Sequence, residues 1–188
     1  MARIAKIETK EDLAPEHHGV FDAIAQSRGR VQGPFPMLLH SPELAGRVAH
    51  LGAHVRFEMG LSQKLKELVI LTVARELDCA FEWSVHAGHA RAAGITDECI
   101  EALRTRGEPG DLTPEEADVR RYARELLRSH RVSPEAFAAV EARLGAAGCV
   151  ELSALIGYYV LLACVLNSME VEPAEGEEPL DPDITERT

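Results

Sequence analysis

The sequence lacks several patterns that would assign it to a familiar class of protein. It has no basic stripe: 20 lysines and arginines face 31 aspartates and glutamates, for a formal net charge of −11, which argues against a nucleic-acid footprint. Its four cysteines form no CxxC pair and no zinc-binding spacing. Residues 1–18 contain no apolar core, so no signal peptide is visible. We therefore expect a cytoplasmic protein with reduced thiols.

Long hydrophobic runs are also scarce, with one exception that needs an explanation. Leu152–Met169 contains 18 residues without a charge, the lower limit for a helix that spans a membrane. Several of these residues are polar, and the run is flanked by Glu151 and Glu170 without a basic anchor. We expect a buried core helix or a subunit-interface helix, and no membrane partner.

The acidic charge is concentrated at one end of the chain. Residues 170–188 hold eight acidic residues and one basic residue, so they contribute −7 of the net −11. With three prolines among them, residues 172–188 are expected to form a solvated, flexible extension. Residues 1–14 are a polar lead-in, and residues 15–171 are expected to form one domain.

Strand-like alternation is scarce, whereas helix start signals recur along the chain. The clearest is Thr113-Pro114-Glu115-Glu116, which combines a capping box with proline at the first helical position. Residues 28–36 contain two glycines and two prolines and are expected to form a loop. We predict an all-α bundle of seven or eight helices. Their expected ranges are 15–27, 41–59, 63–77, 79–94, 96–104, 113–130, 133–144 and 149–171.

Reactive side chains converge in the central stretch, Glu67–Gly94. Cys79, Glu82 and His86 are spaced i, i+3, i+7, so they share one helix face. Asp78 is the expected N-cap, which would place Cys79 in the first turn, where backbone N–H groups and the helix dipole favour a thiolate. Glu82 and His86 form an i, i+4 pair in which the carboxylate can hold and charge the imidazole.

Glu67 lies on a helix that is apolar on nearly all sides, which predicts a buried helix. Leu71 and Ala74 follow it one and two turns later, so its carboxylate should lie beside apolar surface. A desolvated carboxylate has a raised pKa and can exchange protons near neutral pH. The alternative is a structural ion pair between Glu67 and an arginine.

Other residues are weaker candidates for the site. Arg30, Arg56 and Arg75 are candidates for binding an anionic substrate, although exposed salt bridges are the more frequent fate of arginines. Trp83 is a core residue or a pocket wall, and the core is favoured. We expect no metal, because neither the histidine pair at 50 and 54 nor the Glu82-His86-His89 series completes a recognised ligand set.

The remaining cysteines have less chemistry around them. Cys149 and Cys164 are expected to pack as small hydrophobes. Cys99 lies early in a helix capped by Thr96 and shares part of the electrostatic setting of Cys79, but only Cys79 has acid–base neighbours.

The central stretch, with LLHSPEL at 38–44 before it, resembles the carboxymuconolactone decarboxylase and alkylhydroperoxidase D-like family. The matching frame is a helical Glu67, Cys79 twelve residues later, a functional position three residues on, His86 four residues after that, and Gly-Ile-Thr at 94–96. The resemblance is strongest over residues 35–105.

One departure from the family pattern decides the expected mechanism. The peroxidase branch is known for C-x-x-C-x-x-x-H, in which two cysteines form a redox pair. Here Glu82 replaces the second cysteine, so Cys79 has no local partner for a disulfide cycle. The E-W-x-x-H form resembles the decarboxylase-like branch, which is implied to work without metal or organic cofactor.

The resemblance and the residue types together favour acid–base chemistry. We expect decarboxylation or isomerisation of a small anionic unsaturated lactone or keto acid. His86 would be the general acid or base, Glu82 would orient it, Glu67 would be a second proton-transfer group, and Cys79 would be a polar wall or a weak acid. The family also implies a homo-oligomer, trimeric or hexameric.

Two alternatives to this function stay open. The first is a thiol-dependent hydroperoxide reductase, which would use Cys79 with an external thiol. The second is a non-catalytic, ligand-binding oligomer in which the motif residues form a structural network.

Overall fold

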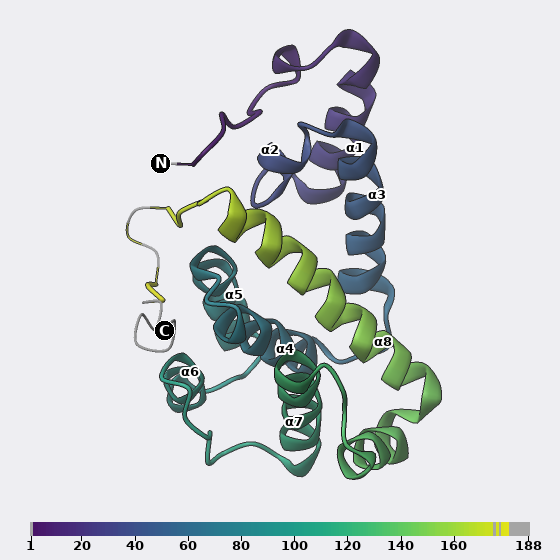
Figure 1. Cartoon of the computed structure of the whole chain (residues 1–188), viewed down its shortest axis with the longest axis vertical. Coiled ribbons are helices and arrows are strands. Elements are labelled where there is room, and N and C mark those ends of the chain that lie inside the picture. Colours follow the sequence, from purple (N-terminus) through teal and green to yellow (C-terminus); the bar gives the residue numbers. More distant parts are fainter. Residues whose placement is uncertain (1, 175, 177, 181–188) are drawn as a thin grey trace. The chain divides into compact units, whose positions relative to one another are not determined.

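The computed structural model describes residues 2–174, 176 and 178–180, and every regular element in this part of the chain is a helix (Figure 1). The predicted all-α fold is therefore confirmed. The α-helices are α1 (His18–Arg28), α2 (Phe35–Leu38), α3 (Pro42–Ala53), α4 (Gln63–Glu76), α5 (Ala80–Ala92), α6 (Asp97–Arg104), α7 (Pro114–Ser129) and α8 (Pro134–Ser168). Short helical turns of other types are η1 (Lys10–Asp12), η2 (Pro15–His17) and the π-helical η3 (His54–Glu58).

The described residues group into two compact units. The first unit comprises described residues of Met1–Met59 and Cys164–Glu172, and the second those of Gly60–Ala163 and Pro173–Thr188. The four central motif residues all belong to the second unit. The boundaries of the single domain expected at 15–171 stay a prediction.

In the first unit, α3 packs against α1 and α2. Pro42 occupies the first turn of α3, and the Ser41 side chain makes no capping hydrogen bond. The loop expected at 28–36 is interrupted by α2, whose four residues are all buried. Burial of Phe35 and Met37 stabilises this turn despite the prolines, because Pro36 is tolerated near a helix start.

The second unit is built around α4, which packs most extensively against α5 and α7. Every residue from Leu65 to Arg75 is buried, as expected for a helix that is apolar on nearly all sides. Its inner residues Leu68 and Leu71 join Trp83 of α5 and Ile100 of α6 in one hydrophobic cluster. This core fixes the two helices that carry the central motif.

Side-chain caps begin α4, α6 and α7 of the second unit, and those of α6 and α7 lie where the sequence placed them. Thr96 accepts a hydrogen bond from the backbone N–H of Cys99, and Ser62 accepts one from Leu65. Thr113 and Glu116 form the complete capping box at the start of α7. Each cap satisfies N–H groups that a helix start leaves without a partner.

α8 contains the uncharged run and one break. Gly145 has φ 68° and ψ 177°, a conformation that favours glycine, so the break lies where the sequence indicated it. Among the described residues, α8 is long and apolar enough to cross a membrane by length and composition alone, and half of its most apolar window is buried. That burial fits the core helix expected. The buried residues of the run include Leu152, Leu155, Ile156, Tyr158, Tyr159, Leu162, Ala163 and Leu166.

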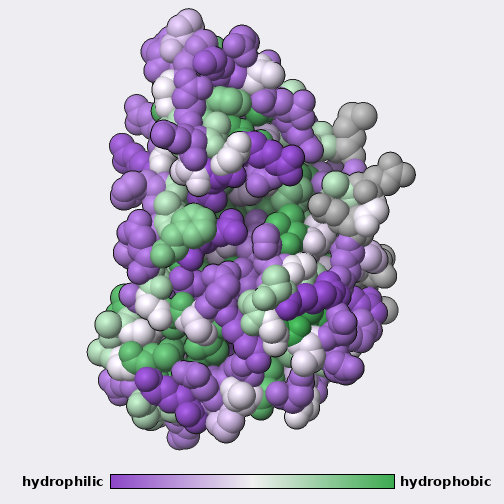
Figure 2. Space-filling model, turned by 180° about the vertical axis from the view of Figure 1, so that it is seen from behind, coloured by the Kyte–Doolittle hydropathy of each residue, from purple (hydrophilic) through white to green (hydrophobic). Residues whose placement is uncertain are grey.

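Hydrophilic side chains cover most of the face drawn in Figure 2, and hydrophobic residues are exposed there in separate patches. Exposed large apolar residues of α8 are Phe137, Val150 and Leu161.

Part of the acidic C-terminal segment packs onto the second unit. Leu180 is only 4% exposed and joins the hydrophobic cluster of α4, α5 and α6. Glu178 accepts a hydrogen bond from Arg91 of α5 at 2.6 Å. The expected solvated extension over 172–188 is thus wrong for Glu178 and Leu180, because an apolar side chain and an ion pair tie them down. Residues 175, 177 and 181–188 of that segment lie outside the described residues.

Candidate active site

The centre of the site is a buried pair between α4 and α5. Nδ1 of His86 lies 2.6 Å from Oε2 of Glu67, and both side chains are almost completely buried. The other carboxylate oxygen of Glu67 accepts a hydrogen bond from the Gln63 side chain at 2.6 Å. Glu67 therefore pairs with a histidine, and not with the arginine that the structural alternative required.

A second carboxylate faces the other nitrogen of the same ring. Oε2 of Glu82 lies 3.3 Å from Nε2 of His86, one helical turn earlier on α5. Burial on its own would lower the pKa of His86, but the hydrogen bonds that its ring donates to Glu67 and Glu82 outweigh it and raise the pKa to about 9. His86 is therefore an imidazolium at neutral pH, held between two carboxylates.

The two contacts of His86 differ in length, and this difference gives them different roles. The short bond to Glu67, itself bound by Gln63, fixes the orientation of the ring. The longer contact to Glu82 is the weaker of the two. A proton on Nε2 can thus leave His86 on the Glu82 side while Nδ1 stays bound.

Cys79 is at the start of α5, but one residue earlier than expected. It is the N-cap itself, not a residue of the first turn, and its side chain is fully buried. Asp78 is not the cap: its φ is 49°, in the left-handed region, and its carboxylate accepts a hydrogen bond from Arg106 at 2.8 Å. Arg106, which is distant in the sequence, binds the side chain that local spacing assigned as the cap.

Arg75 belongs to a cluster of charged side chains that contains several arginines. Its guanidinium is 3.5 Å from Asp78, and it lines a small cavity together with Arg106, Arg120 and Arg124. This places it in an ion-pair cluster on α4 and α7, and its assignment to substrate binding stays a prediction.

Arg30 and Arg56 belong to the first unit. Arg30 donates a hydrogen bond to Gln32 at 2.5 Å, and the Arg56 guanidinium lies 5.5 Å from the ring centre of Phe57. Their assignment to substrate binding also stays a prediction.

Aromatic side chains complete the surroundings of His86. Tyr159 of α8 meets its ring edge-on with centroids 5.3 Å apart, and His89 lies 5.5 Å away. Trp83 is fully buried in the hydrophobic cluster, the position that the sequence favoured. Its indole N–H is buried without a hydrogen-bond partner among the described residues.

Sequence reasoning missed Gln63 and Tyr159. Gln63 had a usable signal, because it lies four residues before Glu67 on the same helix face. Tyr159 had none, since nothing in an uncharged run marks which residue meets a histidine far away in the sequence.

The other cysteines differ among themselves. Burial, helped by Asp111, raises the pKa of Cys99 to about 11, so it does not share the setting expected for a thiolate. Cys149 is buried as expected, whereas Cys164 is exposed, which corrects its expected packing as a small hydrophobe. Within the described residues, no group of three His, Cys, Asp or Glu side chains has the arrangement of a metal site.

The fold defines the class of protein to which this chain is similar. An alkylhydroperoxidase AhpD core protein from Ralstonia eutropha JMP134, an uncharacterised peroxidase-related protein, superposes with a TM-score of 0.77 at 16% identity, over 93% of each chain. A protein of unknown function from Agrobacterium tumefaciens, a putative antioxidant defence protein AhpD, gives 0.67 at 19% identity, over 73% of this chain and 94% of its own. The apo debrominase Bmp8 gives 0.73 at 15% identity, over 92% of each chain. The helical fold is thus AhpD-like.

The sequence of the central segment also matches a known family. Residues 42–125 match the model of the carboxymuconolactone decarboxylase family. The match covers Glu67, Cys79 and His86, so the resemblance inferred from these residues is confirmed. No curated protein matches the sequence.

Proposed function

We propose that the protein is a lyase or isomerase of the carboxymuconolactone decarboxylase type that works by acid–base catalysis without a cofactor. Its substrate would be a small anionic unsaturated lactone or keto acid. The observation that carries this proposal is the buried Glu67–His86–Glu82 group, in which one imidazolium is held between two carboxylates. A protonated histidine fixed by one carboxylate and facing a second is suited to deliver a proton to carbon.

In a decarboxylation, the substrate carboxylate leaves as carbon dioxide and its bonding electrons move into the unsaturated system. That anion then takes a proton, which forms the new C–H bond. His86 is the proton source, Glu82 passes the proton from Nε2 to the substrate, and Glu67 keeps Nδ1 in place. After each turnover, water supplies a proton that restores the protonated Glu67–His86–Glu82 group. An isomerisation uses the same groups, with one proton removed and another delivered.

Cys79 acts here as a polar wall of the site. It lies at the start of the helix that carries Glu82 and His86, so substitution by serine keeps a polar group of similar size. Homo-oligomer formation, as a trimer or hexamer, and a cytoplasmic location belong to the same proposal. A monomer in sedimentation equilibrium at micromolar concentration would contradict the oligomer.

A second candidate, a thiol-dependent hydroperoxide reductase, is supported by the AhpD-like neighbours. A debrominase of the same fold is also known with a cysteine replaced by alanine and with 2,3,4-tribromopyrrole bound. In that reaction, the Cys79 thiolate would attack the peroxide, releasing an alcohol and forming a sulfenic acid. Because Glu82 stands where a second cysteine would, an external thiol would have to reduce the sulfenic acid.

One experiment separates the candidates. Two rates are measured for the wild type, His86→Gln and Cys79→Ser. The first is the consumption of an unsaturated lactone acid, and the second is the consumption of an organic hydroperoxide in the presence of dithiothreitol. We expect lactone turnover to fall by about 100-fold or more in His86→Gln and to persist in Cys79→Ser. Hydroperoxide loss that disappears in Cys79→Ser would instead support the reductase. If both activities are absent and ligand binding is retained, the result would support the non-catalytic alternative.

A further inference from the structure

A stripe of arginines runs along one face of α7, apart from the residues around His86. Arg120, Arg124 and Arg128 are spaced i, i+4, i+8, so they lie one above another on the helix. Like charges at this spacing repel one another. A stripe of this kind in a chain with a net charge of −11 needs anions beside it.

One anion is built into the fold. Glu76 of α4 is only 11% exposed, and both its oxygens accept hydrogen bonds from Arg128, at 2.7 and 2.8 Å. It also lies 3.4 Å from Nε of Arg124. This largely buried carboxylate is a partner on the inner side of the stripe.

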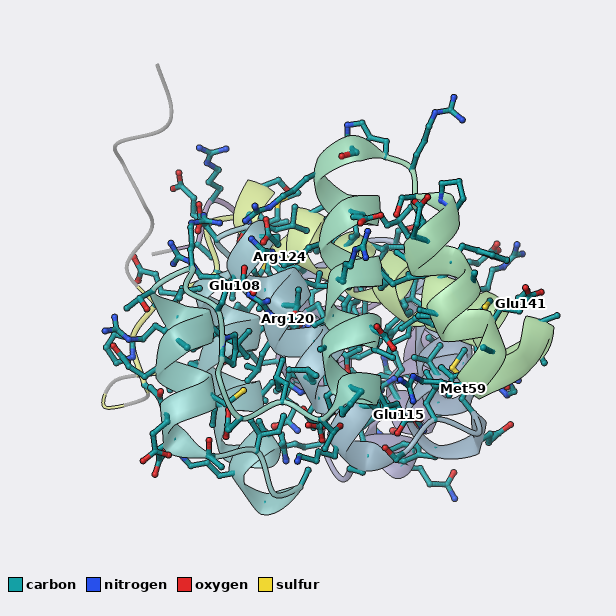
Figure 3. The ribbon with its side chains drawn as sticks, turned by 90° about the horizontal axis from the view of Figure 1, so that it is seen from below. Met59, Glu108, Glu115, Arg120, Arg124 and Glu141 are labelled. Carbon is teal, nitrogen blue, oxygen red and sulfur yellow. The ribbon has the colours of Figure 1, made fainter. Side chains whose placement is uncertain are left out.

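The second anion is different in character. Glu108 lies in the loop that joins α6 to α7, and its carboxylate binds the guanidinium groups of both Arg120 and Arg124. Figure 3 shows the three side chains together. The Glu108 side chain is 68% exposed, whereas that of Arg120 is 7% exposed. An exposed carboxylate on a loop thus covers arginines that are largely buried.

A cavity of about 420 Å³ opens at the same place. Its walls include the α7 arginines, together with the apolar Leu112 and Ala117. The buried Nε of Arg120 has no hydrogen-bond partner among the described residues. The cavity therefore combines guanidinium groups with an apolar wall, as a site for a small organic anion requires.

We propose that this cavity binds a small organic anion through a carboxylate or phosphate group held by Arg120 and Arg124, and that Glu108 occupies the site when the ligand is absent. The arrangement already binds one carboxylate, that of Glu108, so the guanidinium groups are positioned for this chemistry. The incoming anion displaces Glu108, and the apolar wall contacts the ligand's carbon skeleton. Binding therefore releases the loop between α6 and α7.

The test removes the charge of Glu108, the carboxylate that competes with the ligand for Arg120 and Arg124. Binding of pyrophosphate and of succinate is measured by calorimetry in low-salt buffer for the wild type and for Glu108→Gln. We expect both probes to bind about tenfold more tightly to the variant, as when a competitor that fills a site nine-tenths of the time is removed. The tighter probe identifies a phosphate or a carboxylate as the natural group. In the wild type, NMR signals of Gly107 and Gly110 in the displaced loop should shift on binding.

Glu141→Gln is the matched control, because it removes the same charge from an exposed position on α8. We expect its affinities to equal those of the wild type, whereas Arg124→Gln should weaken binding at least tenfold. Equal tightening in Glu108→Gln and Glu141→Gln would show non-specific attraction and overturn the proposal. Absence of binding to Glu108→Gln would also overturn it, and this comparison holds even if Arg124→Gln fails to fold.

Discussion

Replacing Glu67 with glutamine should change how the stability of the protein depends on pH. In the wild type, the pKa of His86 rises from 6.5 to about 9 on folding. Below pH 6.5 the folded and unfolded states both hold the proton, and the stabilisation from the raised pKa is fully present. As the pH rises from 6.5 to 9, only the folded state keeps the proton, so the free energy of unfolding falls.

The size of this effect follows from the pKa. A rise from 6.5 to about 9, at about 1.4 kcal/mol per pH unit, corresponds to about 3 kcal/mol of stability lost across that range. Glu67→Gln removes the carboxylate 2.6 Å from Nδ1, and loss of such a charge typically moves a pKa by about 1 to 3 units. The pKa of His86 should therefore fall, and the decline in stability should become smaller.

Urea unfolding of both proteins between pH 6 and 10 measures this effect, and NMR titration of His86 locates its pKa directly. The difference in stability between wild type and variant should be largest at pH 6 and should shrink towards pH 10. Glu58→Gln is the control, because Glu58 lies 2.8 Å from His54 on an exposed pair; it should leave the profile unchanged. A wild-type His86 that titrates below 6.5, with flat stability from pH 6.5 to 9, would refute the reasoning.

Three further predictions concern packing, capping and thiol exposure. Leu180→Ala should lower the free energy of unfolding by about 2 kcal/mol or more, while Val150→Ala, at a position 70% exposed, should have little effect; equal urea midpoints would contradict the packing of Leu180. Thr113→Ala should destabilise the protein by about 1 kcal/mol through loss of the capping box, measured by thermal denaturation, and an unchanged melting temperature would count against that cap. In native protein, Ellman's reagent should react fastest with the exposed Cys164 and slowly with the buried Cys79, so Cys164→Ser should abolish the fast phase.

Local sequence signals were enough to locate most helices. Thr113 and Thr96 mark helix starts because a cap is formed by residues within one turn of each other. The break at Gly145 was equally visible, since its positive φ favours glycine. The short helix α2 was missed because burial, which the sequence does not show directly, stabilised a segment rich in proline and glycine.

The site could be identified only in part. Glu82 and His86 were paired correctly because they lie one turn apart on a single helix. The bond from Glu67 to His86 crosses between two helices, so the sequence supplied the two residues but not their contact. Asp78 was misassigned because Arg106, 28 residues away, binds its carboxylate. Local spacing contains no information about such a partner.

The packing of Leu180 has a consequence for the order in which the protein folds. Its cluster partners on α4, α5 and α6 lie between Leu68 and Leu103, so the cluster closes across a very long stretch of chain. Contacts between residues so far apart form slowly, because closing the long intervening loop costs conformational entropy. During synthesis, α4 to α6 emerge from the ribosome well before Leu180. The apolar surface that Leu180 covers in the folded protein is therefore exposed until Leu180 docks. The acidic side chain of Glu178 favours solvation of this segment until Leu180 docks.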